Sequence, residues 1–195
     1  MKNVPNILCL IRIALITFIL VFLIPNALTA PMALHLKLLI AGIIFGVAML
    51  TDLFDGMIAR KYDAVTNFGK FIDPIADKLL VICVMMAFVD MELISSIPVI
   101  IILAREFLVT GLRLAAAGKN VVVAANIWGK AKTMTQGVAL GVSFAVLWIA
   151  ALLSPEVTVA NVALTPVPAI LSWLCAAVTA VSAISYYMQC KEYIK

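Results

Sequence analysis

Four aspartates occur at regular spacing in a chain that is otherwise strongly apolar. Asp52 and Asp55 form one closely spaced pair, and Asp73 and Asp77 form a second. On a helix, at about 100° per residue, the members of these pairs fall about 60° and about 40° apart, so that each pair shares one face. A carboxylate beside hydrocarbon costs about 2.5–3.5 kcal/mol on insertion scales and usually marks function. Two facing helices would therefore bring four carboxylates together.

Such a cluster of carboxylates favours a metal site. Like charges at close range repel one another unless a cation lies between them. Hard oxygen ligands without a nearby His or Cys favour Mg²⁺, Mn²⁺ or Ca²⁺ over zinc. The alternative is that these aspartates only cap helices at the membrane edge, but capping does not require paired carboxylates on both helices.

The composition indicates a single membrane domain over residues 1–195. Hydrophobic residues make up 65% of the chain and charged residues 12%, and the mean hydropathy is +1.18. These values predict an all-α membrane protein. The net charge is +4, and no basic patch is interleaved with aromatic residues, so nucleic acid is not an expected partner. The four cysteines show no C-x-x-C spacing and are expected to be buried thiols.

Apolar segments predict a bundle of about six transmembrane helices. Each segment is near the ~20 residues that a spanning helix needs. The segments cover residues 7–24, 32–57, 71–89, 94–117, 133–153 and 167–187. Residues 1–12 offer in addition a short N-terminal interfacial helix, with Pro5 near its start and Arg12 reaching toward the lipid headgroups.

Positive charge is concentrated in alternate connections between these segments. It is contributed by Arg60, Lys61 and Lys70 at the second connection, by Lys119, Lys130 and Lys132 at the fourth, and by Lys191 and Lys195 at the end. The other connections carry little positive charge. By the positive-inside rule, both termini and the aspartates are expected on the cytoplasmic side. The sequence thus predicts a multi-pass protein of the cell (plasma) membrane whose active site faces the cytoplasm.

The aspartates belong to a longer pattern, D-x2-D-G-x2-A-R-x8-G-x3-D-x3-D. Its fixed positions are Asp52, Asp55, Gly56, Ala59, Arg60, Gly69, Asp73 and Asp77. At this motif the chain resembles the CDP-alcohol phosphotransferases, integral membrane enzymes that make phospholipids from CDP-linked precursors. Every fixed position of that family's signature is present without substitution.

The resemblance implies a cofactor of two ions, Mg²⁺ or Mn²⁺, that bind the pyrophosphate of CDP-diacylglycerol and stabilise the leaving CMP. One ion would be shared among Asp52, Asp55 and Asp73, and the second among Asp52, Asp73 and Asp77. Asp77 is also implied as the general base that takes a proton from the attacking hydroxyl.

The motif further implies residues that bind CDP-diacylglycerol. Gly56, Ala59 and Gly69 are small where the nucleotide must approach the backbone. Arg60 can pair bidentately with a phosphate, and the alternative for this residue is a positive-inside anchor.

Two further residues are assigned to the same pocket. Thr66, in the polar connection, can add a hydroxyl group. Asn6 lies in a Pro-Asn segment similar to one that helps close the nucleotide pocket in the family, although Cys9 and Thr17 depart from the threonine and proline expected there.

A second set of charged residues predicts where the acceptor alcohol binds. Arg105 and Glu106 stand inside an apolar helix, and Arg113 follows about 12 Å farther along its axis and about 80° around it. The two arginines could line one pocket, with Glu106 orienting one of them. Lys130 and Lys132 open the next apolar segment. Several cations suit an acceptor that carries its own phosphate better than a neutral alcohol, whereas the alternative is that Arg113 and the lysines are interfacial anchors.

These segments resemble the phosphatidylglycerophosphate synthases of the family, whose REF-x-VTG-x-R and GK-x-KT-x-x-Q patterns they reproduce. The resemblance implies transfer of a phosphatidyl group from CDP-diacylglycerol to sn-glycerol 3-phosphate, with release of CMP and formation of phosphatidylglycerophosphate. Cardiolipin, phosphatidylserine and phosphatidylinositol-phosphate synthases are alternatives within the family. A divalent-cation transporter is an alternative from another class, but it would place its carboxylates near the bilayer midplane.

Two Gly-x-x-x-Gly runs permit close approach between helices. They are Gly42/Gly46 and Gly137/Gly141. Such runs are common in membrane spans, and packing within one bundle is favoured here, with a homodimer as the alternative use.

Overall fold

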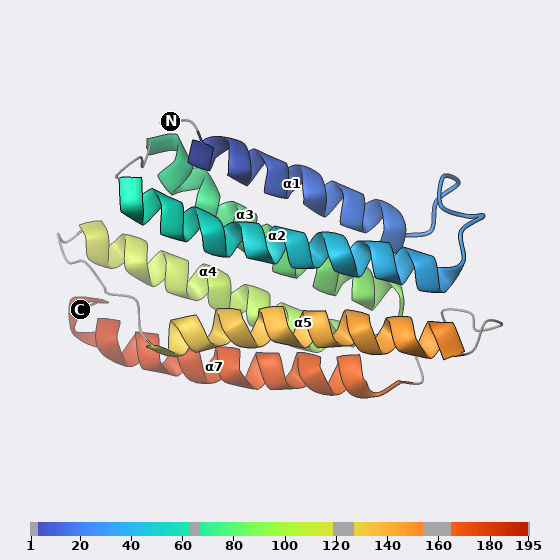
Figure 1. Ribbon diagram of the computed structural model, residues 1–195. Helices are drawn as coiled ribbons and strands as arrows, with labels where there is room; N and C mark the ends of the chain where they lie inside the picture. The colour runs from blue at the N-terminus through green and yellow to red at the C-terminus, as the bar shows by residue number, and fades with distance from the viewer. Residues whose placement is uncertain (1–3, 63–66, 119–126, 154–164, 195) are drawn as a thin grey trace.

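The computed structural model describes residues 4–62, 67–118, 127–153 and 165–194. Within these ranges every regular element is a helix (Figure 1). The helices are α1 (Val4–Leu23), α2 (Leu34–Tyr62), α3 (Asn67–Asp90), α4 (Ser96–Gly118), α5 (Ile127–Leu153) and α7 (Val167–Ile194). The prediction of an all-α bundle is confirmed for this part of the chain.

Three of these helices are long and apolar enough to cross a membrane. The candidate spans are Leu34–Thr51 in α2, Ala131–Leu153 in α5 and Val167–Met188 in α7, each with a mean hydropathy of 2.0. A shorter apolar stretch, Leu10–Leu23, lies in α1. The membrane character predicted from composition is supported, while the crossing of all six helices stays a prediction.

The helices lie side by side and alternate in direction along the chain (Figure 1). α1 packs against α2 and α3, α5 packs against α2 and α7, and α4 packs against α7. As a result, the end of α2 and the start of α3 lie at the same end of the bundle as the start of α1 and the end of α7 (Figure 1). We call this the motif end, because residues 52–62 of α2 and 67–77 of α3 lie there. The start of α1 and the end of α7 thus share one end of the bundle with the aspartate motif, while the cytoplasmic placement of this end stays a prediction.

Three phenylalanines connect α2, α3 and α5 in the apolar core. The ring centroids of Phe45 and Phe144 are 5.5 Å apart, and those of Phe88 and Phe144 are 5.1 Å apart in an edge-on arrangement. Such aromatic pairs contribute about 0.5–1.5 kcal/mol beyond the area they bury. A Cβ atom at Gly42 would lie 3.2 Å from Phe144 Cβ, so glycine lets α2 approach α5 closely. Gly42 therefore serves packing within the bundle.

The helices extend beyond the apolar segments that the sequence delimits. α2 continues to Tyr62, α5 begins already at Ile127, and α7 continues to Ile194. Hydropathy marks only the part of a helix that can lie in hydrocarbon, whereas the backbone hydrogen bonds continue into polar residues. The additional turn at the start of α5 brings Lys130 and Lys132 onto a helix.

Arg12 points into the bundle, and the expectation that it reaches the headgroups is wrong. α1 runs without a break from Val4, so residues expected along the interface belong to the first helix. The side chain of Arg12 is 0% exposed, and Ile16 and Ile19 on the same helix are also buried. Spacings of three and four residues place these side chains on one stripe of α1, which faces its neighbours. Arg12 is buried because it shares this inner stripe.

The two glycines of α2 provide a test of the α2–α5 contact. Gly42→Val should lower stability by about 1–3 kcal/mol relative to Gly46→Val, because its added atoms press on Phe144. Around Gly46, by contrast, no atom lies within 4 Å of an added Cβ atom. Both variants change glycine to valine in the same helix, so their intrinsic helix propensities match. Thermal unfolding in detergent micelles measures the difference, and equal midpoints would contradict the packing role of Gly42.

Candidate functional site

The aspartate motif lies on two consecutive helices at the motif end (Figure 1). The C-terminal part of α2 carries Asp52, Asp55, Gly56, Ala59 and Arg60, and the N-terminal part of α3 carries Gly69, Asp73 and Asp77. Because α2 and α3 run in opposite directions, both halves of the motif are at one end. The side chains of these residues and of Asn6, and all of Thr66, lie outside the described residues, so their roles stay predictions.

A cluster of charged side chains is buried between α3, α4 and α5. Glu106 of α4 lies at its centre and pairs with Arg105 over 3.2 Å (Nη1 to Oε1) and with Lys132 of α5. Lys78 of α3 lies 3.6 Å from the other carboxylate oxygen of Glu106. Arg105, Glu106 and Lys132 are buried, whereas Lys78 is half-buried. Among the described side chains, one carboxylate thus gathers three cations from three helices, and we call this group the Glu106 cluster.

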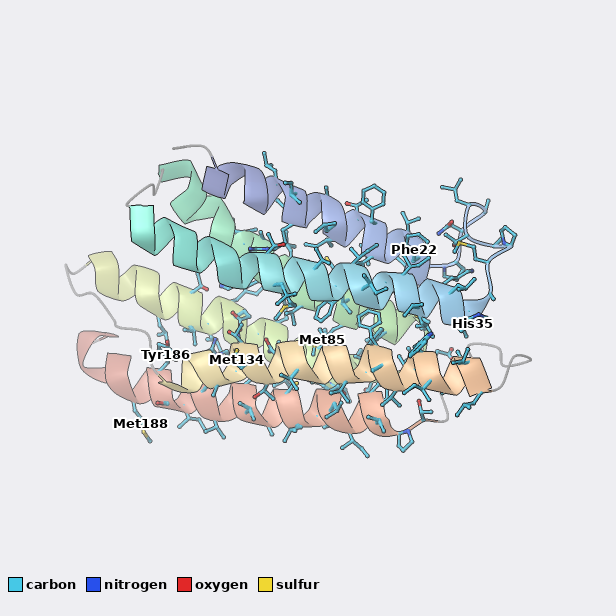
Figure 2. The ribbon with its side chains drawn as sticks, in the orientation of Figure 1. Phe22, His35, Met85, Met134, Tyr186 and Met188 are labelled. Carbon is cyan, nitrogen blue, oxygen red and sulfur yellow. The ribbon has the colours of Figure 1, made fainter. Side chains whose placement is uncertain are left out.

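Helix α7 holds Arg105 from the opposite side. Nη2 of Arg105 donates a hydrogen bond of 2.6 Å to Oγ of Ser182. The guanidinium carbon lies 5.3 Å from the centre of the Tyr186 ring, within the range of a cation–π interaction. Figure 2 shows Tyr186 on the inner side of α7 and the exposed Met188 on its outer side. The guanidinium of Arg105, which extends from α4, is therefore held by two side chains of α7.

Hydrogen bonds extend the cluster along α4 and α5. Nζ of Lys78 donates to Oγ1 of Thr110 over 2.9 Å, and this hydroxyl donates to the backbone oxygen of Glu106 over 2.7 Å. Nε2 of Gln136 lies 3.4 Å from Oγ1 of Thr179, which joins α5 to α7. A small cavity adjoins these groups and is lined by Lys78, Val81, Ile82, Ile102, Glu106, Lys132, Thr133 and Gln136. It lies between α3, α4 and α5.

The Glu106 cluster borders the aspartate motif along α3. Lys78 directly follows Asp77 in the sequence, a step of about 1.5 Å along the helix axis. The side chain of Lys78 extends to Glu106, so α3 carries a member of the cluster and a member of the motif at consecutive positions.

The structure brings together two of the four residues predicted to bind the acceptor phosphate. Arg105 and Lys132 meet at Glu106. Arg113 lies on α4 and Lys130 on α5, with side chains outside the described residues. The expectation that Glu106 orients an arginine agrees with its contact to Arg105.

Sequence reasoning missed the contribution of α7, and it did not place Lys78 at the acceptor site. A signal for α7 exists: its buried, mostly polar side chains recur at alternating intervals of three and four residues, at Ser172, Cys175, Thr179, Ser182 and Tyr186. This interval keeps them on one helix face. A polar stripe in an otherwise apolar helix indicates the side that faces a polar interior.

Comparison with known proteins gives a consistent result. The family model described as CDP-alcohol phosphatidyltransferase matches residues 2–181. A protein of Rickettsia typhi is 40% identical over 194 residues, covering 99% of each chain. A protein of Bacillus subtilis is 46% identical over 145 residues, which is 72% of this chain and 75% of its own. A protein of Salmonella typhimurium is 40% identical over 144 residues, which is 71% of this chain and 74% of its own. All three are named CDP-diacylglycerol–glycerol-3-phosphate 3-phosphatidyltransferase. The family resemblance inferred from the aspartate motif is thereby confirmed.

Neutralising Glu106 tests whether its carboxylate holds the cluster together. Glu106→Gln should lower the free energy of unfolding by about 3–5 kcal/mol, because it removes the carboxylate charge that pairs with buried Arg105 and Lys132. Glu92→Gln is the matched control, since Glu92 is exposed in the turn after α3. Denaturant unfolding in micelles measures both. A Glu106→Gln variant as stable as the control would show that the cluster does not depend on this carboxylate.

Proposed function

Because the chain belongs to the CDP-alcohol phosphatidyltransferase family, we propose that it transfers the phosphatidyl group of CDP-diacylglycerol to sn-glycerol 3-phosphate. The relatives from Rickettsia, Bacillus and Salmonella are named for this reaction. The observation that carries the choice of acceptor is the convergence of Lys78, Arg105 and Lys132 on Glu106. A neutral alcohol would not require three cations, whereas an acceptor that carries a phosphate does.

In the proposed reaction, one bond to phosphorus forms and one breaks. A hydroxyl oxygen of glycerol 3-phosphate bonds to the phosphorus that carries the diacylglycerol. The bond from that phosphorus to the bridging oxygen of the pyrophosphate breaks, and CMP leaves with this oxygen. Asp77 takes the proton of the attacking hydroxyl. The products are phosphatidylglycerophosphate and CMP.

We assign Asp52, Asp55, Asp73 and Asp77 as ligands of two divalent ions, Mg²⁺ or Mn²⁺. A donor set made only of carboxylates suits these hard cations, and the two helix parts that carry it lie at one end of the bundle (Figure 1). When bound, such ions neutralise the pyrophosphate and the charge that develops on CMP.

The remaining motif residues are assigned to the nucleotide and its phosphates. The small residues Gly56, Ala59 and Gly69 leave space for the nucleotide beside the backbone. Arg60 pairs with a phosphate, and Thr66 and Asn6 complete the pocket.

The Glu106 cluster is assigned to the phosphate of the acceptor. Nη1 and Nη2 of Arg105 are engaged by Glu106 and Ser182, whereas its Nε is buried without a hydrogen-bond partner among the described residues. The guanidinium therefore retains a donor for a further oxygen. Arg113 and Lys130 are assigned to the same phosphate. Since Lys78 follows Asp77, the acceptor would be held next to the proposed base.

The proposed topology has six membrane-spanning helices, with both termini and the site on the cytoplasmic face of the plasma membrane. Supporting this, the ends that carry Arg60, Lys70, Lys130 and Lys132 lie at the motif end with the termini (Figure 1). By the positive-inside rule, an end that gathers lysine and arginine faces the cytoplasm. Soluble glycerol 3-phosphate would reach the site from this side.

Removal of the metal ligands tests the assigned aspartates. Asp52→Asn or Asp73→Asn should abolish CMP release, since each would serve both ions, and excess Mg²⁺ or Mn²⁺ should not restore it. EDTA should stop the wild type, and added Mg²⁺ should rescue it. Asp90→Asn, at the far end of α3, is the control and should keep full activity. Undiminished turnover in EDTA would refute the two-metal assignment.

The acceptor assignment is tested by turnover of CDP-diacylglycerol with a panel of alcohols, scored by CMP release. The wild type should prefer sn-glycerol 3-phosphate to glycerol, inositol phosphate, serine and phosphatidylglycerol. Arg105→Ala should raise the KM for glycerol 3-phosphate about ten- to a hundredfold, because a charge-assisted hydrogen bond of about 1.5–3 kcal/mol is lost. The KM for CDP-diacylglycerol should change little. Lys37→Ala, near the opposite end of α2, is the control. Preference for a different acceptor would refute this assignment while leaving the family unaffected.

A further inference from the structure

We infer that Ser182 and Tyr186 of α7 are positioning residues for the acceptor phosphate, which they serve by fixing the guanidinium of Arg105. This inference rests on the proposed function, because it takes the Glu106 cluster as the acceptor site. Neither residue belongs to the aspartate motif or to the two patterns that carry the acceptor cations. Their role follows from contacts between helices that are distant in sequence.

Ser182 fixes one arm of the guanidinium. Its Oγ accepts the 2.6 Å hydrogen bond from Nη2, while Nη1 donates to Oε1 of Glu106 over 3.2 Å. The guanidinium is planar and presents its donors in a fixed fork, so two anchored arms determine where the remaining donor points. Both Ser182 and Arg105 are buried, and water does not compete strongly for these bonds.

Tyr186 supports the same group through its ring. The guanidinium carbon lies 5.3 Å from the ring centroid, and Tyr186 is only 1% exposed, so the ring has little freedom to move. A desolvated arginine over an aromatic face is held more strongly than one at an exposed site. The two hydrogen bonds limit movement within the plane of the guanidinium, and the ring limits its movement toward Tyr186.

Tyr186 also connects the arginine to the start of α5. A Cβ atom at Gly129 would lie 2.9 Å from Oη of Tyr186, which is too close for an undisturbed contact. Gly129 therefore allows the first turns of α5 to pack against the tyrosine. The same turns of α5 carry Lys132, the second buried cation of the cluster. The ring of Tyr186 therefore contacts both Arg105 and the helix that carries Lys132.

The expected consequence is confined to the acceptor. An arginine that is not held in place must lose rotamer freedom on binding phosphate, and this entropic cost weakens binding. Loss of Ser182 or Tyr186 should therefore raise the KM for glycerol 3-phosphate and reduce discrimination against free glycerol. CDP-diacylglycerol is assigned to the aspartate motif on α2 and α3, so its KM should not change.

Steady-state kinetics on the full-length protein in micelles test this with paired variants. Tyr186→Leu and Ser182→Ala should each raise the KM for glycerol 3-phosphate about tenfold, with the KM for CDP-diacylglycerol within about twofold of the wild type. Tyr186→Phe, which keeps the ring, and Ser182→Thr, which keeps a hydroxyl, should restore most of the acceptor affinity.

Ser172→Ala is the matched control, because Ser172 is a buried serine of α7 whose hydroxyl bonds to the backbone oxygen of Ala169 within its own helix. It should leave both KM values unchanged. If Tyr186→Leu and Ser182→Ala raise both KM values equally, or change only kcat, the two residues merely support packing and the inference is wrong. If the wild type accepts glycerol 3-phosphate normally in that experiment, the proposed function survives. A wild type that releases CMP only with phosphate-free alcohols overturns both.

Discussion

The burial of charge inside an apolar bundle is the constraint on which the motif end of this protein depends. An ionised side chain away from water is stable only where opposite charge and hydrogen bonds replace its hydration. Glu106 meets this requirement for Arg105 and Lys132, and it also pairs with the half-buried Lys78. Since these residues come from α3, α4 and α5, the same contacts that solvate the charges also set the positions of three helices. Displacing α4 would separate Lys78 and Lys132 from the carboxylate that they share.

The polarity of the bundle is partly inverted relative to that of a water-soluble protein. Exposed side chains on the outer faces include Phe107, Leu108 and Val138, whereas buried ones include Gln136, Thr179 and Ser182. In a lipid environment apolar side chains gain nothing by leaving the exterior, and polar side chains find partners only inside. Glycine contacts such as that of Gly42 with Phe144 then supply the close packing that the hydrophobic effect does not provide between helices in lipid.

The sequence predicts those features of the fold and the site that depend on local composition. Apolar runs predict the helices, and the charge of Arg105 stands out because ions are rare in such runs, whereas Lys132 directly precedes one. The apolar segments are shorter than α2, α5 and α7, because hydropathy reports contact with lipid and not the extent of the backbone hydrogen bonds. The burial of Arg12 was missed since a cation near a terminus suits both an interface and a core. Ser182 was missed because an uncharged serine, 77 positions from its partner Arg105, has no local signature.

The adjacency of Asp77 and Lys78 on α3 suggests how one small bundle can bind two anionic substrates without mixing their sites. Neighbouring residues on a helix diverge by about 100°, so they address different sides of α3. Lys78 extends to Glu106 and thereby fixes the face of α3 that meets α4. In our proposal, the preceding residue Asp77 belongs to the carboxylate set that α3 shares with α2. A one-residue step along α3 would then separate the cations proposed for the acceptor from the carboxylates proposed for the donor, while the proposed base stays adjacent in sequence to Lys78.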